Sequence, residues 1–329
     1  MSAPHLHHTL AHTVPPLLGH PPPARAVHRL HGSTKKGVHR LTLDDHTTVI
    51  TYLWHPTQDH WPTTHQAHAH TDPFSHASGP DLFLAAHRKL SDLGVRVPHL
   101  HALATSHTHH PGTLAVLEDI PGPPPEQHLP QDPTTTRPVL DRLAHTLRTM
   151  HAHTSPTFGK VAHLAQGHTP TAATCHDLVL HRALDDLQHA AQRDERLHPH
   201  HHRLTHTLHT LAGRITPRTE HSLIHGELGP DHVLVHTHGT PVLIDIEGLM
   251  FFDVEWEHAF LRLRFGPHHT HLATRPLDQA RTDLYTLALH LSLVAGPLRL
   301  LEGPYPDRDT MLAIAEHNLH AALATPTPH

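Results

Sequence analysis

Cysteine, lysine and long hydrophobic runs are scarce in this chain of 329 residues, and each scarcity excludes a class of protein. The single cysteine, Cys175, excludes a framework of intramolecular disulfides. We expect it to fill space beside a helix and not to act as a nucleophile. No run approaches the roughly 20 apolar residues that a membrane-spanning helix needs. The N-terminus lacks the basic start and apolar segment of a signal peptide, so the sequence predicts a cytoplasmic protein without a membrane partner.

Basic side chains are also few. The lysines are Lys35, Lys36, Lys89 and Lys160, and the formal net charge is -6. Binding to nucleic acid requires a concentrated surface of Lys and Arg, so we expect no nucleic-acid partner. The length and the 37% of hydrophobic residues allow one large or two moderate domains. No pattern in the chain indicates its oligomeric state.

Histidine is abundant, with 49 residues, and two interpretations compete: a metal-binding protein, or a drift in the composition of exposed positions. The segment 198–211 favours the second, because at about 100° per residue its histidines and leucines occupy opposite faces of a helix. The two faces are His202, His206 and His209 against Leu197, Leu204, Leu208 and Leu211. We therefore expect solvent-exposed histidines that capture zinc or nickel only adventitiously and that make the chain strongly cationic in mild acid.

The first third of the chain is predicted to be rich in strands. Residues 1–27 are rich in proline and histidine and carry little periodicity, so we interpret them as an N-terminal extension. Residues 28–120 are predicted to form a small β-rich lobe. In it, a loop flanked by Gly32 and Gly37 precedes two alternating β-branched runs, 38–43 and 48–54, and this pattern is typical of a hairpin.

The rest of the chain is predicted to be mostly helical. After a helix over 82–93 and a buried strand over 114–117, the proline-rich stretch Glu118–Pro125 cannot continue a sheet and is the expected hinge. Residues 121–329 form the second lobe, with helices near 139–150, 178–187, 277–295 and 309–323. The sequence thus predicts an α+β fold with two lobes.

A second hairpin is predicted near residue 240, where two short apolar runs flank a turn that contains glycine. We expect Val235 to pair with Val242, and directly opposed residues have Cβ atoms about 5 Å apart. This register gathers four polar side chains at one end of the hairpin: Glu227, Asp231, His232 and Asp245.

Carboxylates gathered in this way suit phosphoryl transfer. That reaction needs one carboxylate near the attacking hydroxyl and others that hold Mg²⁺ against the phosphates. The alternative is an ordinary polar hairpin end, where acidic side chains are common. The residue pattern alone leaves both interpretations open.

Three motifs in this region resemble those of aminoglycoside phosphotransferases and related small-molecule kinases. His225–His232 (HGELGPDH) resembles the catalytic loop H-G-D-x-x-x-x-N, Ile244–Glu247 the metal-binding segment I-D-W-E, and Asp253–Ala259 the segment D-P-x-x-D-L-A. Gly32–Arg40 resembles the nucleotide loop more loosely, and Leu114–Gly122 the strand that leads to the hinge. The resemblance implies a protein-kinase-like fold, ATP and Mg²⁺ as cofactors, and a small-molecule hydroxyl as acceptor.

The resemblance also implies a set of site residues. They are catalytic Glu227 and His225; nucleotide-binding Ser33, Lys35, Lys36, Glu118 and Ile120; and metal-binding Asp245, His232, Asp231 and Glu247. Glu227 replaces the family's catalytic Asp and retains a carboxylate. His232 replaces a metal-binding Asn and is a poor ligand for Mg²⁺, so Asp231 is its expected substitute. Tyr52 aligns with the phosphate-binding Lys of strand three, so we expect Lys35 or Lys36 to supply that charge.

We therefore expect a kinase that transfers the γ-phosphoryl group of ATP to an antibiotic or a metabolite. A pseudokinase that binds nucleotide without transfer is one alternative, favoured by Tyr52, His232 and an apolar Leu84 in place of the family's helix Glu. A kinase for peptide Ser or Thr is another, because residues 155–220 carry no readable acceptor code. Asp253 and Glu257 are expected to brace the catalytic loop.

Overall fold

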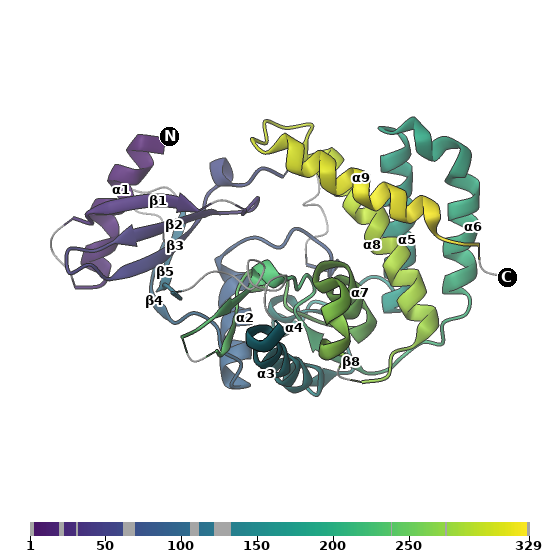
Figure 1. Cartoon of the computed structure of the whole chain (residues 1–329), viewed down its shortest axis with the longest axis horizontal. Helices are drawn as coiled ribbons and strands as arrows, with labels where there is room; N and C mark the ends of the chain where they lie inside the picture. Colours follow the sequence, from purple (N-terminus) through teal and green to yellow (C-terminus); the bar gives the residue numbers. More distant parts are fainter. Residues whose placement is uncertain are drawn as a thin grey trace. The chain divides into compact units, whose positions relative to one another are not determined.

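The computed structural model describes residues 3–19, 23–30, 32–61, 70–105, 112–121, 133–237, 239–273 and 275–327. The chain divides into two compact units (Figure 1). Unit 1 consists of Met1–Trp61, Ala77–Pro133 and Asp231–Glu247, and unit 2 of Pro62–His76, Thr134–Pro230 and Gly248–His329. Within the described ranges, no helix is long and apolar enough to cross a membrane.

Unit 1 is built on a five-stranded antiparallel sheet with the strand order β1-β2-β3-β5-β4. The strands are β1 (Ala26–Leu30), β2 (Gly37–Thr42), β3 (Thr48–Trp54), β4 (Leu100–Ala104) and β5 (Thr113–Glu118). The predicted hairpin is confirmed, because β2 and β3 pair from Gly37 opposite Leu53 to Thr42 opposite Thr48. The predicted strand over 114–117 is also confirmed as β5.

The N-terminal segment contains a helix that sequence analysis missed. Helix α1 (Ala3–Leu17) places Leu6, Leu10 and Val14 on one face, where they pack with Leu41 and other core residues of the sheet. These residues recur every four positions, which is helical spacing. The many histidines and the pair Pro15–Pro16 at the end of the helix obscured this period in the sequence. The segment before residue 28 is therefore part of the core of unit 1.

The other elements of unit 1 are shorter or lie at its edges. They are η1 (Pro56–Gln58), α2 (Pro80–Asp92), η5 (Pro230–His232), the two-stranded ladder of β9 (Val233–Val235) and β10 (Pro241–Leu243), and η6 (Ile246–Gly248). The predicted helix over 82–93 is confirmed as α2, which buries Phe83, Ala86 and Leu90.

Unit 2 is mostly helical, as predicted. Its helices are α3 (Pro133–His151), α4 (Val161–Ala165), α5 (Cys175–Ala191), η4 (Glu195–His200), α6 (His201–Ala212), α7 (Val254–Phe265), η7 (Gly266–Leu272), α8 (Gln279–Leu300) and α9 (Arg308–Ala324). A small sheet has the order β6-β8-β11-β7 and consists of β6 (Thr154–Ser155), β7 (Gly159–Lys160), β8 (His221–Ile224) and β11 (Met250–Phe252).

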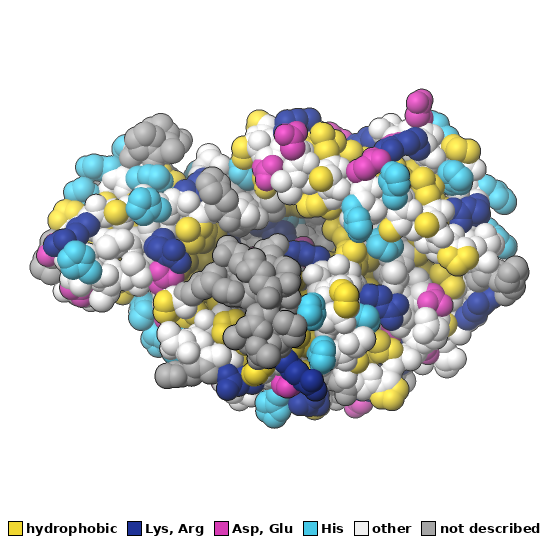
Figure 2. Space-filling view, in the orientation of Figure 1, with side chains coloured by type: hydrophobic (Ala, Val, Ile, Leu, Met, Phe, Trp, Pro, Cys, Tyr) yellow, Lys and Arg dark blue, Asp and Glu magenta, His cyan; other side chains and the backbone are white. Residues whose placement is uncertain are grey.

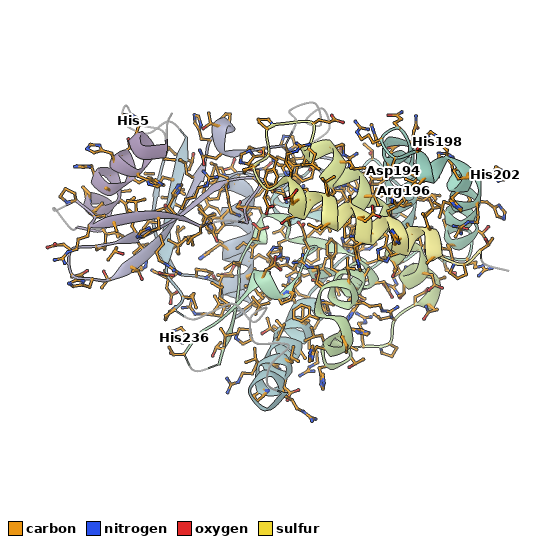
Figure 3. All side chains as sticks on the ribbon, turned by 45° about the horizontal axis from the view of Figure 1, so that its top comes forward. His5, Asp194, Arg196, His198, His202 and His236 are labelled. Carbon is orange, nitrogen blue, oxygen red and sulfur yellow. The ribbon has the colours of Figure 1, made fainter. Side chains whose placement is uncertain are left out.

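Helices α5, α6, α8 and α9 lie side by side and form the helical layer of unit 2 (Figure 1). Their buried leucines belong to one hydrophobic core that also includes Trp256 and Tyr285. On the surface of this layer, Arg196 donates to Asp194 and to Glu316 of α9, so it ties η4 to α9 (Figure 3). Because these side chains are largely exposed, the core and not this ion pair accounts for most of the stability of the layer.

The histidines of α6 are exposed, as predicted. His202, His206 and His209 face solvent, whereas the four leucines of the opposite face are at most 5% exposed. His198 and His202 lie on the outside of the helical layer (Figure 3), and histidines are dispersed over the face shown in Figure 2.

The limits of the two units differ from the predicted lobe boundaries. The boundary predicted at residue 120 lies inside unit 1, whose middle segment continues to Pro133. The predicted hinge lies partly outside the described residues, because the structure describes it only as far as Pro121. The hairpin Asp231–Glu247 belongs to unit 1 and not to the helical unit.

Candidate active site

The β9–β10 hairpin carries three of the four predicted metal ligands at one end. Its register is shifted by one residue from the predicted one: Val235 lies opposite Pro241, and Val233 opposite Leu243. The predicted pairing of Val235 with Val242 is therefore wrong. Proline has no amide hydrogen to donate to a ladder, which argued against pairing Pro241. The turn closes through a hydrogen bond from the His236 amide to the Thr240 carbonyl, so the next residue, Pro241, lies opposite Val235.

The shift still leaves His232 and Asp245 close to each other. The amide of Ile244 donates to the carbonyl of His232 at 3.0 Å, and the His232 Nε2 to Asp245 Oδ2 distance is 3.8 Å. His232 Nε2 also lies 3.6 Å from Asp231 Oδ2. The structure therefore brings Asp231, His232 and Asp245 together in unit 1, as predicted.

Asp245 has a strained backbone. Its φ is +56°, and His46 is the other non-glycine residue with positive φ among those the structure describes. A left-handed conformation costs a residue other than glycine about 1–2 kcal/mol, and such strain concentrates at functional sites. The turn at Asp245 ends the run of β10 and redirects the chain into η6, which carries Glu247.

Lys36 completes this site. Its Nζ donates to Asp245 Oδ1 at 2.6 Å and to Glu247 Oε1 at 2.6 Å. The residue is only 3% exposed, and its ammonium lies over the ring of Tyr52, 4.7 Å from the ring centroid. Lys36 thus brings a cation from the loop before β2 to Tyr52 of β3, the residue expected to align with the family's lysine.

Neighbouring charges determine the protonation of Lys36 and Asp245. Burial opposes the charged ammonium, but the carboxylates of Asp245 and Glu247 outweigh it and raise the pKa of Lys36 far above its usual range. Burial likewise opposes the charged carboxylate of Asp245, but the neighbouring Lys36, His232 and Lys35 hold its pKa well below its usual range. Burial raises the pKa of Tyr52, so its phenol stays neutral. At neutral pH Lys36 is therefore an ammonium and Asp245 a carboxylate.

These residues fit a divalent cation such as Mg²⁺. Glu247 is 3% exposed, and its Oε2 has no hydrogen-bond partner among the described residues. Asp245 uses Oδ1 for Lys36 and keeps Oδ2 on the side of His232. Hard cations prefer such carboxylate oxygens, and an unsatisfied buried oxygen costs about 1–3 kcal/mol. Imidazole suits Mg²⁺ poorly, so Asp231 is the better third candidate.

The loop before β2 has fixed ends. The backbone carbonyl of Lys35 accepts from Ser78 Oγ at 2.9 Å, and Trp61 Nε1 donates to Thr34 Oγ1 at 2.9 Å. Ser33 and Lys35 are half-buried in this loop. Sequence analysis could not choose between the two lysines; the structure directs Lys36 to the carboxylates.

At the start of the predicted hinge, the Glu118 side chain is already engaged. Arg96 Nη2 donates to both of its carboxylate oxygens, at 2.5 and 2.6 Å, and the His99 amide donates to Oε2 at 2.9 Å. Burial disfavours the charged carboxylate, but these donors outweigh it and lower the pKa of Glu118. Ile120 is buried, at 2% exposure. A nucleotide role for Glu118 and Ile120 through their backbone groups stays a prediction.

The loop with His225 and Glu227 is braced by α7 within unit 2. The buried amide of His225 donates to Glu257 Oε2 at 2.6 Å, and Trp256 Nε1 donates to the Gly226 carbonyl at 3.0 Å. Gly226 has a φ of +91°, and a Cβ there would lie 3.0 Å from Met250 Cε, so glycine is required. Glu257 therefore braces the loop, as predicted.

Glu227 itself is exposed, and His225 is fully buried. They belong to unit 2, whereas the cluster of Lys36, Asp245 and Glu247 belongs to unit 1, so the predicted gathering of Glu227 with the metal ligands stays a prediction. Asp253 differs from expectation, because its carboxylate accepts from Arg281 Nε at 2.9 Å and from Tyr285 Oη at 2.6 Å, not from the loop.

An antiparallel sheet with helices α1 and α2 in one unit, and a mostly helical second unit, correspond to the N-lobe and C-lobe of kinase-like phosphotransferases. The sequence pattern of the family described as "Phosphotransferase enzyme family" (APH) matches residues 71–283. This match covers more than half of the chain, and the chain belongs to that family. The expected α+β, protein-kinase-like fold and the expected resemblance are confirmed, and the chain is a phosphotransferase.

Solved structures agree on the fold. An APH(2″) phosphotransferase in complex with GDP and kanamycin has 14% sequence identity and a TM-score of 0.61 over 91% of this chain and 94% of that one. Spectinomycin phosphotransferase with ADP and spectinomycin has 14% identity and a TM-score of 0.62 over 92% and 94%. Choline kinase LicA from Streptococcus pneumoniae has 13% identity and a TM-score of 0.58 over 92% and 94%. No curated protein matches the sequence.

Proposed function

We propose that this chain transfers the γ-phosphoryl group of ATP to a hydroxyl of a small molecule, an antibiotic or a metabolite. The observation that carries the proposal is the buried Lys36, held 2.6 Å from both Asp245 and Glu247. Phosphoryl transfer depends on positioning and on neutralising charge, and it uses a cation for the phosphates and carboxylates for the metal. Lys36, Asp245 and Glu247 supply both in one cluster.

Lys36 takes the role of the family's strand-three lysine. Strand β3 contains no Lys or Arg, and Tyr52 offers only a neutral phenol at the matching position. The loop before β2 can carry its lysine to the phosphates because Lys36 immediately precedes the first residue of the strand. Lys35, the alternative candidate, lies close enough to Asp245 for its positive charge to help lower the pKa of that carboxyl group.

Asp245 and Glu247 would hold Mg²⁺, with Asp231 as the third oxygen donor. Bound there, Mg²⁺ would neutralise phosphate charge as the bond to the leaving group breaks. Asp245 is orientated for this by its strained backbone, and Lys36 would pass from the carboxylates to the phosphate oxygens when nucleotide binds.

Glu227 would accept the proton of the attacking hydroxyl. It is exposed on a loop that Glu257 and Trp256 hold rigidly, so its carboxylate is accessible to an acceptor while its backbone is fixed. His225 is fully buried, and we assign it the shaping of the loop through its amide bond to Glu257.

Relatives of the same fold support the acceptor class. Two of the similar solved structures are complexes with GDP and kanamycin and with ADP and spectinomycin, and a third is a choline kinase. These acceptors are small molecules, which argues against a peptide Ser or Thr acceptor. A pseudokinase is the second candidate, because Tyr52 and His232 replace two of the family's polar site residues.

The experiment is calorimetric titration of metal-stripped protein with ATP, with and without Mg²⁺, followed by turnover with kanamycin, spectinomycin and choline as probes. Lys36→Met should weaken binding of the nucleotide about tenfold to a hundredfold, as loss of a charged hydrogen bond does. Lys35→Met is the matched control and should change it less than about threefold.

The outcomes separate the candidates. Mg²⁺-dependent binding that is lost in Asp245→Ala, together with turnover of any probe, supports the enzyme. Mg²⁺-dependent binding without phosphate transfer to any of a broad panel of hydroxyl acceptors supports the pseudokinase. Equal losses in Lys35→Met and Lys36→Met would contradict the assignment of Lys36.

A further inference from the structure

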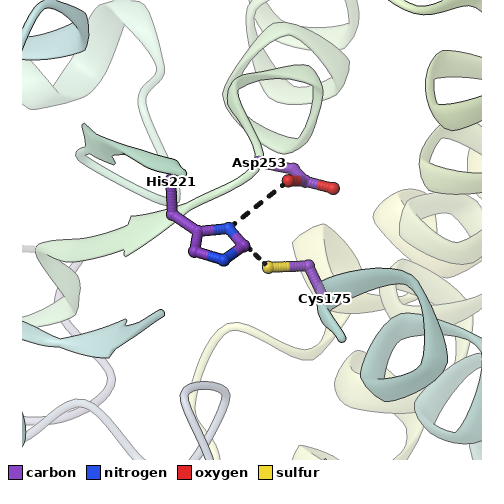
Figure 4. A group of neighbouring side chains, drawn as sticks. All are labelled: Cys175, His221 and Asp253. Carbon is purple, nitrogen blue, oxygen red and sulfur yellow. Dashed lines mark hydrogen bonds and ion pairs between the residues drawn. The ribbon is translucent and has the colours of Figure 1, made fainter. Parts of the chain in front are cut away.

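Three buried side chains of unit 2 that have no assigned part in phosphoryl transfer converge: Cys175, His221 and Asp253 (Figure 4). The Cys175 Sγ to His221 Nδ1 distance is 3.4 Å, and the His221 Nδ1 to Asp253 Oδ1 distance is 3.6 Å. The three ligand atoms lie within 4.8 Å of one another, and the residues are 2%, 5% and 2% exposed. No substrate can reach them without local unfolding.

Local structure explains why they meet. In the antiparallel pair of β8 and β11, Ser222 lies opposite Phe252, so the residues next along the two strands, His221 and Asp253, emerge side by side. Cys175 is the first residue of α5, whose N-cap is Thr174. Burial and the neighbouring Asp253 carboxylate raise the pKa of the Cys175 thiol, so it is protonated until a metal ion displaces the proton.

One oxygen in this cluster is unsatisfied. Asp253 Oδ2 accepts from Arg281 and from Tyr285, whereas Oδ1 has no hydrogen-bond partner among the described residues. The nearest donors are too distant for a hydrogen bond: His221 Nδ1 at 3.6 Å and Arg218 Nη1 at 3.7 Å. A buried carboxylate oxygen that faces a thiol and an imidazole nitrogen supplies three of the four donors of a tetrahedral zinc site.

We propose that Cys175 Sγ, His221 Nδ1 and Asp253 Oδ1 bind a structural zinc ion. Zinc bonds of about 2.3 Å to sulfur and about 2.0–2.2 Å to nitrogen and oxygen, at tetrahedral angles, place sulfur about 3.6 Å from nitrogen and nitrogen about 3.4 Å from oxygen. The observed distances of 3.4 and 3.6 Å match these within the small movements that metal binding requires. Sulfur, imidazole and carboxylate together favour zinc over Mg²⁺ or Ca²⁺.

The surrounding charges also favour a cation. Glu255 binds Arg218 with both oxygens, at 2.6 and 2.7 Å, so this pair is neutral. Arg281 pairs with both Asp253 and Asp278, which leaves one net negative charge. Deprotonation of Cys175 adds a second, and a divalent ion neutralises both. Uncompensated charge in such a buried place is costly, so a dication improves the balance.

The zinc would join the start of α5, β8 and the start of α7. Strand β8 leads directly into His225, and α7 supplies the Glu257 and Trp256 that hold the loop. This role is structural and does not depend on the proposed function, because none of the three ligands is assigned to transfer. Sequence analysis disfavoured a histidine-based metal protein because the histidines of 198–211 lie on a solvent face, and it interpreted Cys175 as a space-filling residue. The spacing of 175, 221 and 253 follows no short motif that could have revealed this cluster.

The test uses the single cysteine as a reporter. Protein unfolded in chelator and refolded with one equivalent of Co²⁺ should show a near-ultraviolet charge-transfer band from a cobalt–thiolate bond. Only Cys175 can give this band, because the chain has one cysteine and its 49 histidines supply nitrogen ligands only. Cys175→Ala should lack the band, and His221→Gln should weaken Co²⁺ binding at least about tenfold.

Zinc retention gives a second measurement. After brief treatment of the folded protein with chelator, the natural sequence should keep about one equivalent of zinc and Cys175→Ala close to none. His202→Gln, which alters an exposed histidine of α6, is the matched control and should keep as much as the natural sequence. Two results would overturn the proposal: refolded protein with a reduced cysteine that binds Co²⁺ without the thiolate band, or equal zinc retention in Cys175→Ala. If Cys175→Ala does not fold, the band in the natural sequence decides alone.

Discussion

Acid should destabilise unit 2 through two buried imidazoles, His151 and His258. They are 3% exposed each, and their ring centroids are 5.8 Å apart. Burial, with added repulsion from nearby His258 and Arg275, lowers the pKa of His151 to about 3. Burial is also the main cause that lowers the pKa of His258 to about 4, although Glu255 opposes it. Both rings are therefore neutral in the folded protein at neutral pH.

The unfolded chain binds protons at these positions at higher pH, because an unperturbed histidine has a pKa of about 6.5. Stability is therefore fully present above about pH 6.5 and is lost as the pH falls toward the folded-state values near 4 and 3. At pH 5 each residue costs about 2 kcal/mol relative to pH 8, and the pair about 4 kcal/mol. Domains are typically stable by only about 5–15 kcal/mol, so this loss is large.

The assay is urea unfolding at pH 8 and pH 5, with the free energy of unfolding extrapolated to water. His258→Gln removes one titrating group and should lower the pH-dependent loss by about 2 kcal/mol, whatever its effect at pH 8. His202→Gln, on the exposed face of α6, should leave the loss unchanged. An equal loss in His258→Gln and in the natural sequence would refute the argument, because general repulsion among surface histidines is common to both.

Three further predictions concern other parts of the chain. Glu227→Gln should abolish phosphate transfer and leave the calorimetric affinity for ATP within about threefold, since only proton acceptance is removed; normal turnover would show that another group acts as base. Gly226→Ala should lower the free energy of unfolding in urea by about 1–3 kcal/mol, because alanine is strained at a φ of +91° and its Cβ would lie 3.0 Å from Met250 Cε. An unchanged urea midpoint of unfolding would mean that the loop relaxes around the added methyl group. Leu10→Ala should lower the free energy of unfolding in urea by about 2–4 kcal/mol, because Leu10 of α1 is fully buried against the sheet. A loss below about 0.5 kcal/mol, the usual limit for surface positions, would show that the packing of α1 contributes little to stability.

Much of the fold could be predicted because local patterns agreed with it. The β2–β3 hairpin has alternating β-branched residues around a turn, and α6 has leucines and histidines on opposite faces. Helix α1 was missed because its apolar face is only three residues long and lies among histidines and prolines. The one-residue error at Pro241 has a similar origin: an edge ladder tolerates a proline that a longer sheet would exclude.

The site was predicted in part. Asp231, His232 and Asp245 follow one another closely along a hairpin, so their meeting could be derived from sequence. The choice of Lys36 over Lys35 could not, because it depends on which side chain the loop turns toward carboxylates more than 200 residues away. The cluster of Cys175, His221 and Asp253 was hidden for the same reason.

The ion pairs of Lys36 have a consequence for which ligands the site admits. Because Lys36 stands against both Asp245 and Glu247, acidic side chains outnumber basic ones in this group of three. The carboxylates would repel a triphosphate that carries no metal, whereas they would attract the divalent ion of a metal–triphosphate complex. For the proposed reaction, the cluster therefore disfavours metal-free nucleotide and favours nucleotide that arrives with its divalent ion.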